Sequence, residues 1–76
     1  MVTKSDLTRP MKRAVVMFHG SARSATEARA DARSIRALID KGLLRWSSGP
    51  STRKLYVLTP EGNEIYSTID MEEAGL

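Results

Sequence analysis

The chain has 76 residues, no cysteine, a single histidine and a formal net charge of +3. This length allows one domain with a small core, and the composition excludes both a disulfide framework and a zinc site built from Cys and His. Residues 1–54 hold all twelve Lys and Arg with four acids, a net +8, whereas residues 55–76 hold five acids and no base, a net −5. The asymmetry predicts a polyanion-binding face and an acidic end kept away from it.

The hydropathy of the sequence predicts where the protein is located. The longest uninterrupted apolar run, Ala14 to Phe18, is far shorter than the roughly 20 residues of a membrane span, and it is too short for the apolar core of a secretory signal. The sequence therefore predicts a cytoplasmic protein without membrane contact. We expect a single domain over residues 1–76, with flexible ends at about 1–6 and 71–76.

The first predicted helix covers about residues 9–19. Its apolar residues recur at helical spacing and should face the core: Met11, Ala14, Val15 and Phe18. Thr8 is a candidate N-cap and Pro10 is tolerated in the first turn, while Gly20 should end the helix. Lys12 and Arg13 lie on the other face.

The segment 25–41 allows two interpretations. Ser24 and Glu27 fit a capping box, so a helix should begin at about residue 25. It either continues to Lys41 as one helix, or breaks near 29–32 with Asp31 capping a second helix. Because no Gly or Pro marks a turn, the sequence leaves both open; Gly42 ends the segment in either case.

The remaining elements are a hairpin and a last helix. Residues 44–46 and 53–58 are β-prone runs separated by a turn-rich segment. Thr59 and Pro60 then begin a helix over about 60–70. A two-stranded hairpin is barely stable alone, so it should pack against the preceding helix. The side chains expected in this contact are Leu44, Trp46, Tyr56 and Leu58 from the hairpin and Ile35, Leu38 and Ile39 from the helix; Ile65, Tyr66 and Ile69 should bury the last helix.

Several segments in this order resemble a known family. They are Arg33–Leu38, then Lys41-Gly42-Leu43-Leu44, and then Tyr56–Gly62 with its Leu-Thr-Pro-x-Gly pattern. Over about residues 7–69 the chain resembles the winged helix-turn-helix domain of MarR-type and PadR-type transcriptional regulators and of small phage and actinobacterial proteins. The resemblance implies an α+β fold of three to four helices with a two-stranded β-hairpin wing. The long flanking helices that dimerise MarR-type regulators are absent from this sequence.

The resemblance also implies a function. It is double-stranded DNA binding, as a small transcriptional regulator, with a recognition helix at about 31–41 in the major groove and a wing at about 47–54 on the backbone or minor groove. Arg33 and Arg36, three residues apart, share a helical face. The nucleic-acid-binding residues that we predict are Arg29, Arg33, Ser34, Arg36, Ala37, Arg45, Ser51, Thr52, Arg53 and Lys54.

Other readings remain open. A winged helix can instead serve as a protein-interaction module, for example a phage protein docking on a host factor, or it can bind nucleic acid without sequence preference. A homodimer through the C-terminal helix is open as well. With one histidine, no cysteine and no phosphate-loop glycine pattern, we expect no enzyme activity, no metal site and no cofactor.

Overall fold

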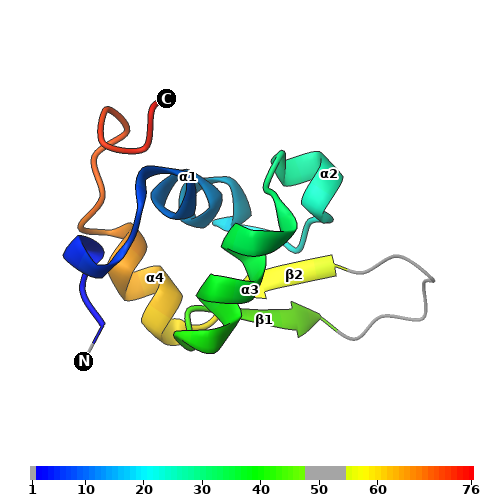
Figure 1. Ribbon diagram of the computed structural model, residues 1–76. Coiled ribbons are helices and arrows are strands. Elements are labelled where there is room, and N and C mark those ends of the chain that lie inside the picture. Colours follow the sequence, from blue (N-terminus) through cyan, green and yellow to red (C-terminus); the bar gives the residue numbers. More distant parts are fainter. Residues whose placement is uncertain (1, 48–54) are drawn as a thin grey trace.

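The computed structural model describes residues 2–47 and 55–76, and these form an α+β fold (Figure 1). The described elements, in chain order, are the 3-10 helix η1 (Lys4–Asp6), α1 (Arg9–Phe18), α2 (Ala25–Ala28), α3 (Ala32–Asp40), β1 (Leu44–Ser47), β2 (Leu55–Leu58) and α4 (Pro60–Tyr66). The predicted fold class is confirmed, because four α-helices and one antiparallel hairpin are arranged in a way compatible with a small winged helix.

Helix α1 is the centre of the core. It contacts α2, α3, α4 and β2, and its four predicted inward residues are all buried, with Val15 and Phe18 fully enclosed. Thr8 occupies the N-cap position, but its side chain makes no capping hydrogen bond, contrary to the expectation. The helix ends at His19 and Gly20, where Gly20 adopts φ 96°. The imidazole of His19 stacks on the ring of Tyr66, with centroids 3.6 Å apart, and so joins the ends of α1 and α4.

The segment 25–41 forms two helices, not one. The Ser24 hydroxyl accepts the Glu27 N–H at 3.2 Å, and the Glu27 carboxylate accepts the Ser24 N–H at 3.1 Å, as the capping box predicts. Asp31 caps α3 by accepting the Ser34 N–H at 3.1 Å. The break therefore falls within the predicted region and uses the predicted second cap.

Arg29 makes the break between α2 and α3. It has φ 53° and ψ 39°, which is the left-handed conformation that glycine usually supplies at a helix end. The N–H of Ala30 bonds to the carbonyl of Ala25 and the N–H of Arg29 to that of Thr26. The end of α3 repeats this hydrogen-bond pattern, with Gly42 at φ 76° in the equivalent place. An arginine thus occupies a position where glycine would be less strained.

The hairpin pairs Leu44 with Leu58 and Trp46 with Tyr56. Leu44 and Leu58 are buried, but Trp46 is 65% exposed, so its predicted place in the core is wrong. The reason lies in the neighbours of each strand. Strand β2 is flanked on its far side by Arg23, which exchanges two backbone hydrogen bonds with Tyr56, and the Tyr56 ring packs edge-on against Phe18. Strand β1 has no such neighbour among the described residues and leaves Trp46 uncovered.

Ile39 is the second predicted core residue that the structure exposes, at 40%. Helix α3 buries Ile35 and Leu38, and Ile39 lies farther round its surface. Beyond Gly42, the chain turns back so that Leu43 is 1% exposed and its N–H bonds to the carbonyl of Leu38. Leu43, which the sequence pattern did not single out, covers the end of the helix in place of Ile39.

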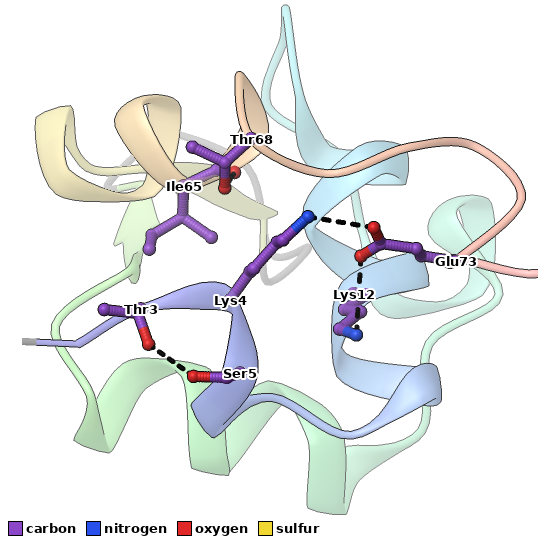
Figure 2. A network of polar contacts seen from close by, with 7 residues as sticks. All are labelled: Thr3, Lys4, Ser5, Lys12, Ile65, Thr68 and Glu73. Atoms are coloured by element: carbon purple, nitrogen blue, oxygen red, sulfur yellow. Dashed lines mark hydrogen bonds and ion pairs between the residues drawn. The ribbon is translucent and has the colours of Figure 1, made fainter.

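Both chain ends pack against the domain, where the sequence predicts flexible segments. Leu7 and Ala74 are buried at 6% and 1% exposure. The Glu73 carboxylate receives a hydrogen bond from the Lys4 ammonium at 2.9 Å and lies 3.5 Å from the Lys12 ammonium (Figure 2). Helix α4 ends at Tyr66 rather than near residue 70, and Ile69 stays half-buried against the core. No helix in residues 2–47 and 55–76 is long and apolar enough to cross a membrane.

Acidification should loosen these contacts. The pKa of Glu73 lies below its ordinary value, chiefly because Lys4 donates a hydrogen bond to it. A lowered folded-state pKa stabilises the fold fully above the unfolded value of 4.5 and loses that contribution as the pH falls through the folded value. We therefore expect Glu73→Gln to lower Tm at about pH 7 and to match the wild type at about pH 2. Thermal melts followed by circular dichroism measure this, with the exposed neighbour Glu72→Gln as control; equal melting of E73Q and E72Q at neutral pH would contradict it.

Candidate nucleic-acid interface

The outer face of α3 carries the arginine pair that the sequence predicts. Arg33 and Arg36 are both exposed, and Ala37 is half-buried beside them. Ile35 and Leu38 anchor the opposite face in the core, which turns both guanidinium groups to solvent. Within the described residues, neither arginine forms an ion pair or a side-chain hydrogen bond. The pair therefore has its full donor capacity available for an external acceptor.

Ser34 does not belong to this face. It is 6% exposed and lies in the first turn of α3, where its N–H bonds to the Asp31 carboxylate. The Ser34 side chain, followed by the Ser34 N–H, holds the pKa of Asp31 below its ordinary value. The prediction that Ser34 contacts phosphate does not fit a buried residue whose polar groups serve the helix cap.

Arg45 is exposed but lies on the other side of the hairpin from the α3 pair. Side chains alternate along a strand, so Arg45 and its partner Val57 point away from the face that carries Leu44, Trp46 and Tyr56. Arg36 lines a hollow together with Tyr56, so it lies on the Tyr56 side of the hairpin and not on the Arg45 side. The structure does not bring Arg45 together with Arg36. Four predicted wing residues, Ser51, Thr52, Arg53 and Lys54, lie outside the described residues.

A hollow between α3, α2 and β2 lies beside the predicted residue Arg36 and has a volume of about 360 Å³. Ile39 and Tyr56 also line it, and the sequence did not assign these two residues to the site. Trp46 stands opposite Tyr56 on the same face of the hairpin and is 65% exposed. Sequence reasoning missed Trp46 because an aromatic residue in an alternating strand is normally a core residue. The available signal of its exposure was that the Trp46–Tyr56 pair lies closer to the turn of the hairpin than the Leu44–Leu58 pair.

Arg29 lies apart from the α3 pair, at the turn between α2 and α3. It lines a second hollow together with Arg9 and Arg13 of α1, and the volume of this hollow is about 340 Å³. Asp31 is the only carboxylate among its lining residues. Of the predicted contacts, the structure thus groups Arg33, Arg36 and Ala37 on one face and places Arg29 on an adjoining one.

The acidic residues of the C-terminal part do not cover the α3 pair. Glu61 and Glu64 lie beside Lys41 around a hollow under the N-terminal segment, and Glu73 binds Lys4 and Lys12. In Figure 1, α4 and the C-terminal segment lie on the left of the molecule, and strands β1 and β2 extend to the right. The charges are not fully divided between the two ends, because Lys4, Lys12 and Lys41 lie beside these acids and the C-terminal segment also lines the hollow of Arg29.

Neither metal chemistry nor known relatives add to this description. No group of three or more His, Cys, Asp or Glu that could hold a metal ion occurs in the part of the chain that the structure describes. Comparison with protein-family models, with curated proteins and with solved structures finds no match to this chain.

Proposed function

We propose that this protein is a non-enzymatic, winged-helix double-stranded DNA-binding protein that acts as a small transcriptional regulator. The observation that carries the proposal is the outer face of α3, where Arg33 and Arg36 are exposed and have no ion-pair partner among the described residues. The order of helices followed by a hairpin and the motifs shared with MarR-type and PadR-type regulators support the same conclusion.

The dimensions of α3 suit the major groove. An α-helix with its side chains is about 10–12 Å across, and the major groove of B-DNA is about 12 Å wide. An arginine can donate two hydrogen bonds to O6 and N7 of guanine, which makes this the commonest base-specific contact. In the proposed complex, Arg33 and Arg36 read base edges, while Trp46, opposite Tyr56 on the hairpin, packs against the DNA at the groove edge.

The fold limits the surface that is available for a homodimer. In the C-terminal helix, through which the sequence leaves a homodimer open, Ile65 is 7% exposed and belongs to the core. Tyr66 and Ile69 are half-buried, which leaves Met71, beyond the end of α4 and 50% exposed, as the most accessible apolar residue of this segment. We therefore propose that the domain binds as a monomer to a short site, instead of as a dimer on two half-sites about 34–36 Å apart.

The salt dependence of DNA binding by the wild-type protein tests the proposal. If about five phosphates are neutralised, log K should fall with log salt at a slope of about −4 to −5. Fluorescence anisotropy with a labelled duplex of about 20 base pairs, titrated at several salt concentrations, measures this slope. Binding that is absent, or that does not change with salt, would sink the proposal.

A protein-interaction module is the second candidate, and one observation favours it. Trp46 and Ile39 are exposed at 65% and 40% and lie on either side of Tyr56, and exposed apolar patches often mark protein contacts. A stoichiometric protein partner that survives nuclease treatment, and that is lost with Trp46→Ala but kept with Arg36→Ala, would favour this candidate over DNA binding.

A further inference from the structure

The hollow beside α1 concentrates positive charge outside the α3 pair. Arg9 and Arg13 reach it from α1, and Arg29 reaches it from the turn before α3. The rest of its lining is Asp31 and small side chains or glycine backbone. Gly75 approaches so closely that a Cβ built on it would lie 3.1 Å from Nε of Arg9. Three guanidinium groups from two separate segments therefore surround one solvent-open space.

The single carboxylate of the hollow is already engaged. Asp31 accepts the Ser34 N–H at 3.1 Å and thereby caps the first turn of α3. None of the three arginines forms an ion pair or a side-chain hydrogen bond with another described residue. Three like charges around one hollow repel one another, and an anion bound among them would remove this repulsion.

The conformation of Arg29 is a second, independent observation. Arg29 is the only non-glycine residue with positive φ among the described residues. The left-handed conformation is unfavourable for any residue with a Cβ, and strain of this kind is concentrated at functional sites. Glycine at this position would relieve the strain but would also remove one of the three charges from the hollow. The strained backbone at Arg29 therefore coincides with a guanidinium placed at the hollow.

The N-terminus of α1 adds to the positive electrostatic potential at this hollow. Arg9 is the first residue of this ten-residue helix, the first turn contains no acidic side chain, and Thr8 makes no side-chain cap. The positive end of the helix dipole is consequently not neutralised by the protein's own groups. Pro10 removes one amide donor, so the arginines, and not the backbone, would supply most of the hydrogen bonds to an anion.

We propose that this hollow binds a backbone phosphate of the DNA, next to the segment that α3 reads. The proposal rests on the proposed function and adds a contact outside α3 and the hairpin. Its location follows from chain connectivity, because Arg29 and Asp31 immediately precede α3 and the hollow therefore opens at the helix end that carries Arg33. Arginine binds phosphate through paired, charge-assisted hydrogen bonds. A phosphate contact fixes position on the duplex and carries no sequence information.

The test compares single arginine variants on two labelled duplexes, one carrying a selected site and one scrambled. Arg13→Gln and Arg29→Gln should each weaken binding to both duplexes equally and should each reduce the salt slope by about 0.9. Lys41→Gln removes the same charge at the other end of α3, beside Glu61 and Glu64, and should leave the slope unchanged. Arg29→Gly should reduce the slope as well while raising Tm by about 2–6 °C, because it relieves the backbone strain.

Each outcome decides one of two questions. If R13Q and R29Q bind like K41Q while Arg36→Ala weakens binding, the hollow is not a phosphate site and the α3 interface stands. If the weakening appears only on the selected duplex, the arginines read a base and the assignment to a phosphate is overturned. If the wild-type protein binds neither duplex, the proposed function and the phosphate site both fail. A shift of the arginine side-chain resonances by inorganic phosphate in NMR spectra would not rescue either proposal.

Discussion

Gly62→Ala should remove most of the free energy of unfolding of the protein. Gly62 lies in the first turn of α4, and a Cβ at this position would overlap the carbonyl oxygen of Leu43 and lie 3.2 Å from Cβ of Leu58. Overpacking costs about 1–3 kcal/mol and sometimes more. The overlap here involves backbone, so we expect at least ~3 kcal/mol, most of the ~3–5 kcal/mol available to a domain of this size.

The junction around Gly62 cannot readily relax. The Leu43 carbonyl accepts the Thr59 N–H at 3.1 Å, the Thr59 hydroxyl donates to the Gly42 carbonyl at 2.6 Å, and the Gly62 N–H bonds back to that hydroxyl at 3.1 Å. Moving α4 outward to admit a methyl group would break this set of contacts. The Leu-Thr-Pro-x-Gly pattern thus has a physical explanation at its last residue.

Urea and thermal unfolding followed by circular dichroism measure the effect. Helix propensity alone predicts the opposite sign, since Ala is about 1 kcal/mol better than Gly inside a helix. Asn63→Ala, an exposed change in the same helix, is the matched control and should alter stability by no more than about 0.5 kcal/mol. A G62A protein as stable as the wild type would show that α4 does not pack against Leu43 as described.

Arg36→Ala should reduce affinity for a selected DNA site by ~1–3 kcal/mol, which is about 5-fold to 150-fold. Arg36 is exposed on α3 and borders the hollow that Tyr56 also lines, so its guanidinium is accessible to an external acceptor. Because Arg33 lies one turn earlier on the same face, the double variant R33A/R36A should lose the distinction between selected and scrambled duplexes.

Stability and charge need separate controls in this experiment. Both arginines are exposed, so the variants should melt within about 0.5 kcal/mol of the wild type. Lys41→Ala removes one charge from the same helix outside the proposed face and should weaken binding little. If K41A and R36A weaken binding equally, the effect is one of net charge, and α3 does not read base edges.

The sequence predicts the elements better than it predicts the surface. Capping signals at Ser24, Asp31 and Thr59 are local, since each side chain bonds to a backbone amide three residues later, and such signals can be read from the order of residues alone. The sequence offered a break near 29–32 as one of two interpretations but could not decide between them, because no Gly or Pro marks the turn and an arginine adopts the left-handed conformation.

The errors concern which side chains are covered. Trp46 and Ile39 have the periodicity of core residues, but their exposure depends on where neighbouring segments end. The pairing of Arg23 with Tyr56 covers β2 and not β1, and nothing in the local sequence indicates this pairing. Of the candidate site, the α3 arginines follow from helical spacing, whereas the hollow of Arg9, Arg13 and Arg29 needs the tertiary structure.

A binding-site selection from a random duplex pool, at about 0.05 M and about 0.2 M salt, tests the central claim most directly. The wild-type protein should enrich one short sequence at both salt concentrations, with weaker binding at the higher one, and R33A/R36A should enrich none. Recovery of an unenriched pool by the wild-type protein, or of the same enriched sequence by R33A/R36A, would contradict the claim that α3 reads DNA.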